Sequence, residues 1–245
     1  MDQDSLASVR AGAESFLKQS KTLNILINNA GVMATPEGKT KDGFETQFGT
    51  NHVAHFLLFQ LVKDTLLASS TSDFPSRVVS VSSFGHRSGE PRLNDYNFTE
   101  AGSYNPWAGY GQAKTANIWF ANEIERRYGS KGLHATSLHP GGIATGLQVH
   151  VPEMMDAVAG NKQVENYMKS PEQGAATSVY AALSEEWKNK GGKYLSDCEE
   201  QAPFAHAEDP MFVGDDGYAP WAYDEEKAKK LWSDSLKMVG MVDDQ

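Results

Sequence analysis

The sequence predicts an α/β fold in which a parallel sheet carries helices on its faces. Strand-like and helix-like segments alternate along the 245 residues, and this alternation is the pattern of parallel sheets. Hydrophobic residues make up 40% of the chain and charged residues 22%, which is enough apolar material to bury a core. The length favours a single domain over residues 1–245.

The predicted elements follow one another in a regular order. Residues 4–18 carry apolar side chains at helical spacing, and the apolar run at 23–28 is typical of a buried strand. The later elements are a helix at 40–68, a strand at 77–82, a helix at 108–128, a strand at 134–139, a helix beginning at Ser170, a strand at 192–195 and a helix at 224–239. Loop composition is expected at 86–107 and 143–168; the second contains Met154 and Met155, which can fill a core gap or line a substrate pocket.

Charge and cysteine content exclude several classes of function. The net charge of -10 argues against nucleic acid or an anionic membrane as a partner. No apolar stretch is long enough to span a bilayer, and the first residues do not resemble a signal peptide. Cys198 is the single cysteine, so no internal disulfide can form. These features favour a reducing, cytoplasmic location.

The residue pair that carries chemistry is Tyr110 and Lys114, four positions apart in a predicted helix. At this spacing the two side chains share one face. An ammonium near a phenol favours the phenolate and brings its pKa toward working pH, which makes a general acid/base. The same spacing occurs at Tyr223 and Lys227, in an acidic segment where solvated pairing is the simpler interpretation.

Other polar residues stand where predicted strands end. Ser83 follows a buried strand, where open α/β sheets place ligands, although a turn-forming hydroxyl is the alternative. Asn51 lies inside an apolar helix and can be a functional amide or a satisfied core group. Asn28-Asn29-Ala30-Gly31 and Pro140-Gly141-Gly142-Ile143-Ala144-Thr145 each follow a strand, with glycine permitting a tight backbone path.

In this order, these motifs resemble the short-chain dehydrogenase/reductase family. The segments 51–58 and 81–86, together with His139-Pro140-Gly141, resemble its retinol-dehydrogenase-like and WW-domain-oxidoreductase-like branch. The resemblance runs from about Asp2 to the C-terminus. It implies a Rossmann-like, doubly wound parallel sheet.

The resemblance also implies roles for individual residues. Tyr110 would be the catalytic acid/base, and Lys114 would lower its pKa and hold the nicotinamide ribose. Ser83 would orient the substrate oxygen, with Ser82 the less favoured neighbour. Asn51 would hold the water of a proton relay.

The cofactor implied by the resemblance is NADP or NAD. Asp2 would lie near the adenine, Asn28 and the Ala30-Gly31 turn on the adenosine side, and the segment after the third strand at the nicotinamide. The implied contacts are Asp2, Asn28, Ala30, Gly31, Lys114, Pro140, Gly141 and Thr145. No metal site is expected, because His52, His55 and His86 stand where the branch carries structural histidines and no third ligand is spaced to join them.

The sequence departs from the family in one respect. The Gly-rich turn that holds the pyrophosphate on a helix N-terminus is absent from the sequence. The fold is therefore expected to be N-terminally truncated, without its first strands and helices, and NAD(P) binding is expected to be weakened or lost. The strand at 23–28 would then have an open apolar edge, covered by a partner chain, the N-terminal helix or a second copy.

Three functions fit these observations. The first is an oxidoreductase that interconverts a small lipophilic alcohol and its ketone or aldehyde with NAD(P)(H). The second is a cofactor-independent acid/base enzyme, such as an isomerase, dehydratase or cyclase, that uses Tyr110, Lys114 and Ser83. The third is a non-catalytic binding protein that keeps the fold. The resemblance also implies a homo-oligomer paired through the helices at 40–68 and 108–128.

Overall fold

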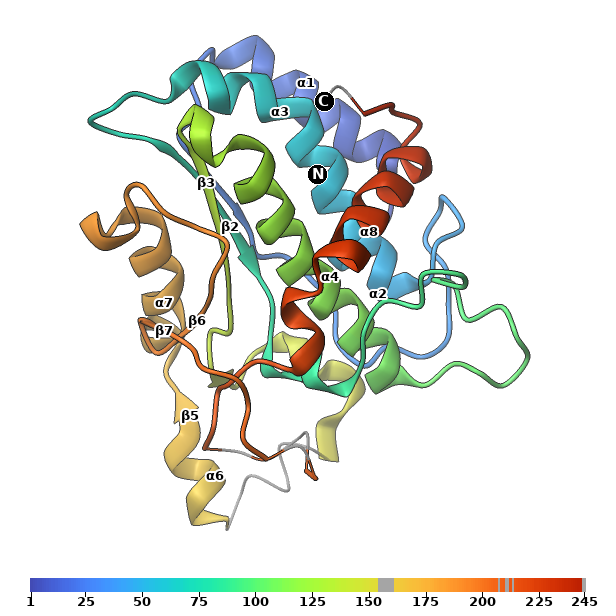
Figure 1. Ribbon diagram of the computed structural model, residues 1–245. Helices are drawn as coiled ribbons and strands as arrows, with labels where there is room; N and C mark the ends of the chain where they lie inside the picture. Colours follow the sequence, from blue (N-terminus) through green and yellow to red (C-terminus); the bar gives the residue numbers. More distant parts are fainter. Residues whose placement is uncertain (154–160, 207, 210–211, 213, 244–245) are drawn as a thin grey trace.

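The computed structural model describes residues 1–153, 161–206, 208–209, 212 and 214–243, and it confirms the predicted parallel sheet (Figure 1). Four strands run parallel and a fifth runs antiparallel at one edge, in the order β1-β2-β3-β6-β7. These strands are β1 (Ile25–Asn28), β2 (Ser76–Val81), β3 (Leu133–Leu138), β6 (Tyr194–Ser196) and β7 (Glu199–Glu200).

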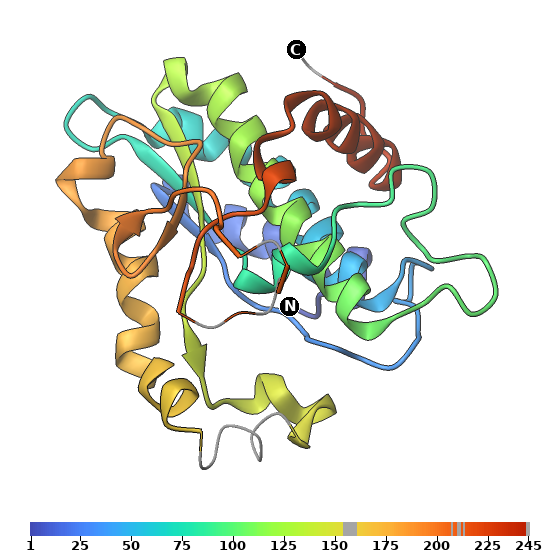
Figure 2. The same cartoon turned by 60° about the horizontal axis from the view of Figure 1, so that its bottom comes forward.

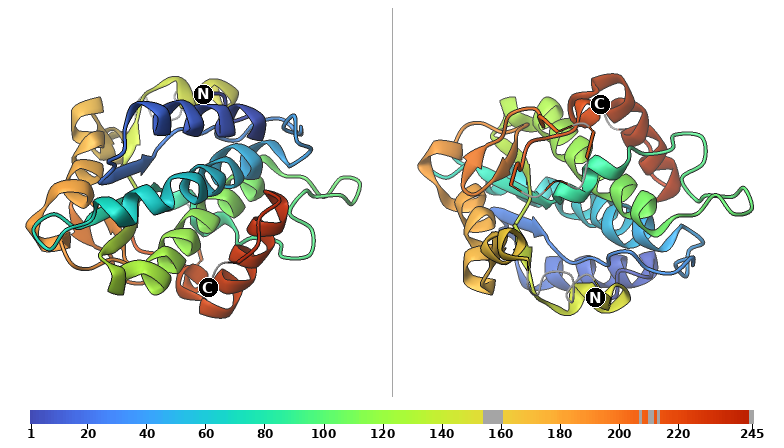
Figure 3. Two further views of the ribbon diagram at one scale, coloured as in Figure 1. Left: turned by 90° about the horizontal axis from the view of Figure 1, so that it is seen from above. Right: turned by 90° about the horizontal axis from the view of Figure 1, so that it is seen from below.

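Helices cover the two faces of the sheet unequally. One face carries α1 (Leu6–Gln19), α3 (Ala54–Ser69), α4 (Pro106–Tyr128) and α8 (Glu225–Met238). The other face carries α7 (Pro171–Leu183), which packs on β2 and its neighbours (Figure 2). The view from above, on the left of Figure 3, shows α1, α3 and α4 along the same face of the sheet.

Helix starts follow the capping residues. Ser170 caps α7, and its reciprocal bonds with Gln173 confirm the capping box that the sequence predicts. α4 begins at Pro106, two residues before the predicted start, because the Asn105 side chain accepts from the amides of Trp107 and Ala108. Asp224 caps α8.

The predicted helix at 40–68 is wrong at its beginning. The first helical turn is α2 (Thr46–Phe48), whose amides are capped by the buried carboxylate of Glu45. A π-helical turn, η1 (Gly49–Val53), then leads into α3. This π-turn contains Asn51, and such turns are frequent at functional sites.

The predicted loop at 143–168 is also wrong in part, because it contains regular structure. Its elements among the described residues are β4 (Gly142–Ile143), η4 (Gly146–His150), α6 (Lys162–Tyr167) and β5 (Met168–Lys169). β4 and β5 pair in parallel as a separate small sheet. Met154 and Met155 lie outside the described residues. The first three residues of the other predicted loop, 86–107, belong to a 3-10 turn, η2 (Phe84–Ser88).

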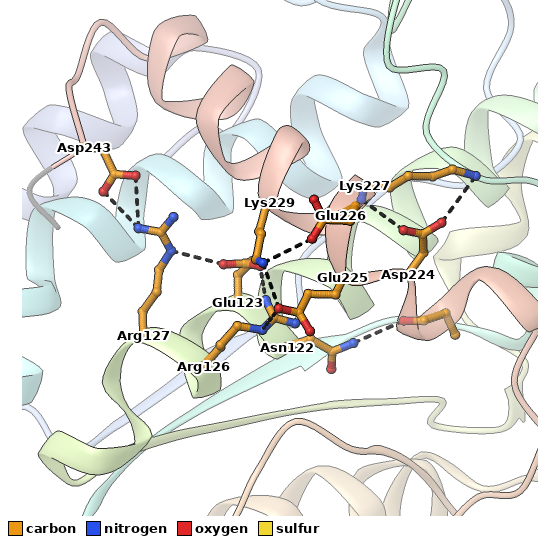
Figure 4. A network of polar contacts seen from close by, with 11 residues as sticks. Asn122, Glu123, Arg126, Arg127, Asp224, Glu225, Glu226, Lys227, Lys229 and Asp243 are labelled. Carbon is orange, nitrogen blue, oxygen red and sulfur yellow. Dashed lines mark hydrogen bonds and ion pairs between the residues drawn. The ribbon is translucent and has the colours of Figure 1, made fainter.

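The C-terminal helix α8 closes the core on the face of α3 and α4. Trp232 contacts Phe56, Phe59 and Phe120 with ring centroids 5.0–6.2 Å apart. A polar network surrounds this contact: Arg127 binds both Glu123 and Asp243 (Figure 4). α8 therefore occupies part of the surface through which a pairing of subunits was expected, and that pairing stays a prediction.

β1 forms an edge of the sheet, since β2 is its one strand neighbour within the described residues. Ile27 on this strand is 42% exposed, in keeping with the expected open apolar edge. Helix α1 packs on α3 and does not pair with this edge. Among the described helices, none combines the length and the apolar character that a membrane span needs.

The aromatic contact of α8 predicts a large stability effect. Trp232→Ala is expected to lower the free energy of unfolding by ~3–5 kcal/mol, because it removes a side chain that is 2% exposed from a close-packed cluster. Phe74→Ala is the matched control, since Phe74 is 41% exposed and its loss should cost below about 1 kcal/mol. Urea denaturation measures both; equal losses would contradict the assignment of α8 to the core.

Candidate functional site

The site is built where α4 lies directly against the turn η2. Two glycines permit this approach. A Cβ at Gly111 would lie 2.8 Å from the Gly89 nitrogen, and a Cβ at Gly85 would lie 2.7 Å from Cε1 of Tyr110. Any larger residue at either position would push the phenol of Tyr110 away from the end of β2.

The two neighbouring serines at the end of β2 have different environments. The Ser82 hydroxyl donates to the carbonyl oxygen of Lys114 at 2.7 Å and so ties the strand to α4. The Ser83 hydroxyl accepts from the Gly85 amide at 3.0 Å, and it lies near the Tyr110 phenol, where it acts to lower the pKa of that group. The structure therefore brings Ser83, and not Ser82, to Tyr110. Ser83 also has the turn-forming role that the sequence left as an alternative.

Burial decides the protonation of Tyr110. The phenol is 3% exposed, and desolvation raises its pKa from 10.0 to about 12, whereas the bond with Ser83 acts in the opposite direction. This differs from the prediction that Lys114 would lower the pKa of the phenol. In this structure Tyr110 is a neutral proton donor at physiological pH.

The Lys114 ammonium lies between the Tyr110 ring and the end of β2. Its Nζ is 5.5 Å from the centroid of the Tyr110 ring and donates to the Val81 carbonyl at 3.1 Å. The side chain is 5% exposed, and burial lowers the pKa of Lys114 from 10.5 to about 8. The group therefore changes charge close to physiological pH.

The walls around Tyr110 are apolar. Buried Met33, Ala34 and Val151 pack with Tyr110, and Trp107 and Leu147 complete the cluster. These residues come from the loop after β1, from the start of α4 and from the segment after β4. The side chains that pack against the Tyr110 ring therefore come from three separate segments, and all of them are apolar.

Asn51 uses its side chain on the backbone of the loop after β1. Its Oδ1 accepts from the Val32 amide and its Nδ2 donates to the Val32 carbonyl, both at 2.9 Å. Its own carbonyl accepts from His55 Nδ1 at 2.8 Å. The side chain is thus a satisfied core amide, which was one of the two interpretations of the sequence. The role of Asn51 in holding the water of a proton relay stays a prediction.

Several predicted cofactor residues line one hollow of about 470 Å³. Asp2, Ala30 and Gly31 lie on its wall, together with Val32 and the start of α2. A Cβ at Gly31 would lie 2.8 Å from Asn51 Oδ1, so a larger residue there would have to displace the Asn51 amide. Both oxygens of the Asp2 carboxylate make bonds within the chain, Oδ1 with the Asp4 amide at 3.0 Å and Oδ2 with the Lys41 ammonium at 2.8 Å.

Asn28 does not belong to this hollow. Its side chain is 2% exposed, and neither amide atom has a hydrogen-bond partner among the described residues. In the sheet it stands in register with Ser80, which is also buried without a side-chain partner in that part of the chain. Asn28 is therefore buried in the sheet, whereas Ala30 and Gly31 lie on the wall of the hollow.

The segment after β3 approaches the site from the opposite side. Gly141 has a φ of +97°, and a Cβ there would lie 2.5 Å from Cδ of Lys169. Thr145 is exposed, and its side chain caps η4. Pro140, Gly141 and Thr145 thus lie on one strip of backbone that ends in Leu147, at the Tyr110 cluster.

The remaining residues singled out by the sequence have structural contacts. Lys227 pairs with Glu90, and the Tyr223 hydroxyl accepts from the Tyr194 amide, so this Tyr-Lys pair forms no second acid/base site. His86 anchors the site turn, with Nδ1 on the Ser83 carbonyl at 2.6 Å and Nε2 accepting from Ala219. Within the described ranges, no three His, Cys, Asp or Glu side chains gather as metal ligands do.

Sequence reasoning missed three residues that hold the site together. Gln47 binds the Ala34 amide at 2.8 Å, Arg87 stacks on Phe204 at 3.9 Å, and Tyr167 bonds to His139 at 2.8 Å. Their partners are distant in sequence, so no local spacing could have indicated them.

Comparison with known proteins gives consistent results. A family model described as short chain dehydrogenase matches residues 1–156. The chain is 52% identical over 242 residues to the short-chain dehydrogenase/reductase prx1 of Penicillium roqueforti, covering 98% of this chain and 69% of the relative. It is 37% identical over 244 residues to retinol dehydrogenase 13 of Homo sapiens, covering 98% of this chain and 68% of the relative. An uncharacterised protein from Mycobacterium paratuberculosis has a similar solved structure, with a TM-score of 0.69 at 30% identity, covering 99% of this chain and 75% of that one.

The contact between α4 and η2 predicts the effect of a single methyl group. Gly85→Ala is expected to displace the Tyr110 ring and to lower the free energy of unfolding by about 1–3 kcal/mol through overpacking. Gly146→Ala is the control, because a Cβ there meets no atom within 4 Å. Thermal unfolding and a crystal structure of each variant test this; an unmoved ring in Gly85→Ala would refute the proposed constraint.

Proposed function

The chain belongs to the short-chain dehydrogenase/reductase family of oxidoreductases, and we propose that it interconverts a lipophilic alcohol and its ketone or aldehyde with NAD(P)(H). The observation that carries the proposal is the convergence of Ser83, Tyr110 and Lys114 inside an apolar cluster. The name of the human relative, retinol dehydrogenase 13, fits a lipophilic alcohol as substrate.

In the reducing direction, Tyr110 donates its phenolic proton to the substrate carbonyl oxygen. Its raised pKa keeps that proton in place until the oxygen gains negative charge. Ser83 holds the same oxygen by a hydrogen bond, and the Lys114 ammonium stabilises the phenolate that forms. In the oxidising direction the phenolate takes the proton back from the alcohol.

Bound NAD(P)(H) would supply or accept the hydride at the carbon atom. On this chain, Asp2, Ala30 and Gly31 would hold the adenosine part in the hollow described above. Lys114 would contact the nicotinamide ribose, and Pro140, Gly141 and Thr145 the nicotinamide. Asn28 would support this wall without touching the cofactor, since its amide is buried in the sheet.

The direct test combines cofactor binding with loss of the phenol. We expect saturable binding of NADPH or NADH by fluorescence titration, and turnover of apolar aldehydes or ketones. Tyr110→Phe should keep cofactor binding and lose at least about 10²-fold in kcat, because the proton donor is gone. Tyr223→Phe, in the other Tyr-Lys pair, is the control.

Two outcomes would replace the proposal. Turnover that depends on Tyr110 without any binding of NADPH or NADH would indicate the cofactor-independent acid/base enzyme. Biological activity that survives both Tyr110→Phe and Lys114→Ala would indicate the non-catalytic binding protein.

The pKa of Lys114 predicts a pH dependence for the reduction. The ammonium is present below about pH 8 and is lost above it, since burial brings the pKa of Lys114 to about 8. We therefore expect kcat/KM to fall by about tenfold per pH unit above this point. In Lys114→Arg the guanidinium stays charged, so the fall should vanish between about pH 8 and 10 even if activity is low. A fall that persists in this variant would assign the titration to another group.

A further inference from the structure

A half-buried carboxylate outside the Tyr110 cluster connects two loops at the end of the sheet. Asp216 accepts a hydrogen bond from the Tyr167 hydroxyl at 2.6 Å through Oδ1. Its other oxygen accepts from the hydroxyl of Ser196, which ends β6 and is fully buried. Both carboxylate oxygens are therefore engaged by hydroxyl donors.

These bonds fix the direction of a longer chain that includes His139. The Tyr167 oxygen is 2.8 Å from His139 Nε2. Since a carboxylate only accepts, the phenolic hydrogen points to Asp216, and His139 must donate from Nε2. Burial lowers the pKa of His139 and keeps the ring neutral, so the network assigns the Nε2–H tautomer. The order is His139 to Tyr167 to Asp216.

Tyr167 holds the small β4–β5 sheet in place. It directly precedes β5, which pairs with β4, and its ring would lie 3.4 Å from a Cβ at Gly142 in β4. The His139 ring stacks on Tyr167 at 6.3 Å and meets Phe84 edge-on at 5.1 Å. The small sheet is thus fixed beside the turn that carries Ser83.

β4 is connected in turn to the wall of the Tyr110 cluster. Gln148 in η4 donates to the Ile143 carbonyl of β4 at 2.8 Å. Leu147, beside Gln148, and Val151, at the end of this turn, pack with Tyr110. A continuous set of contacts therefore runs from Asp216 through Tyr167 and β4 to the apolar wall.

We propose that Tyr167, clamped between His139 and Asp216, is a positioning residue that sets where Leu147 and Val151 pack beside Tyr110 and thereby selects lipophilic substrates. The substrate part of this inference rests on the proposed function. The clamp itself touches neither Ser83 nor Tyr110, so its loss changes how substrate is held and leaves proton transfer intact.

Tyr167→Phe tests the clamp, because it removes both hydrogen bonds and keeps the ring. We expect faster hydrogen exchange in residues 142–151, and a rise of about tenfold in KM for decanal with NADPH while kcat stays near its original value. Tyr180→Phe is the matched control, since it removes a hydroxyl-carboxylate bond to Glu186 on the surface. Asp216→Ala should reproduce Tyr167→Phe, and Asp216→Asn, which keeps an acceptor oxygen, should have a smaller effect.

Hydrogen exchange separates this inference from the proposed function. Faster exchange confined to 142–151 supports the clamp, even where decanal is not turned over. Unchanged exchange in this segment overturns it, as does an equal increase in β1, β2 and β3, which would indicate general destabilisation. A loss in kcat with constant KM would likewise overturn the positioning role.

Discussion

The site depends on how closely α4 approaches the turn η2. Gly85 and Gly111 leave no space for a side chain between these elements, and this brings the Tyr110 ring onto Ser83. The approach is held from both sides: Ser82 bonds to the Lys114 carbonyl, and the Thr115 hydroxyl bonds to the Gly89 carbonyl at 2.7 Å. Two rigid segments can therefore hold acid/base groups without further adjustment, which is the condition for a preorganised site.

The same close packing determines the charges of the site. Desolvation disfavours the charged form of each group, so it raises the pKa of Tyr110 and lowers that of Lys114. The two pKa values therefore move apart, from 10.0 for Tyr110 and 10.5 for Lys114 to about 12 and about 8. At physiological pH the phenol therefore keeps its proton, while the Lys114 ammonium lies close to its own titration point. Burial is the main cause of both pKa shifts. The Ser83 hydroxyl opposes the shift of Tyr110, because it favours the ionised form of the phenol.

The sequence predicted the elements whose signal is local and missed those that depend on distant contacts. The strands ending at Asn28 and Val81 and the capped helix after Ser170 carry their own apolar runs or caps. Tyr110 and Ser83 were predictable because each stands at a recognisable position, on a helix and at a strand end. The start of the second helix was misplaced because the Glu45 carboxylate, and not a standard cap, begins it. The pairing of β4 with β5 joins residues about 25 positions apart, as does the bond from Tyr167 to His139, and no periodicity encodes either.

The contacts of Asn51 show why a polar residue inside a helix is not by itself evidence of a catalytic residue. Its amide pairs with both backbone groups of Val32, as a neighbouring strand would, and this fixes the loop that leaves β1. On one side of this point Ala30 and Gly31 line the hollow; on the other, Met33 and Ala34 pack on Tyr110. One amide thus fixes the loop that joins the hollow to the cluster around Tyr110. Both amide atoms bind the Val32 backbone, so the first role of the Asn51 side chain is to hold this loop in place.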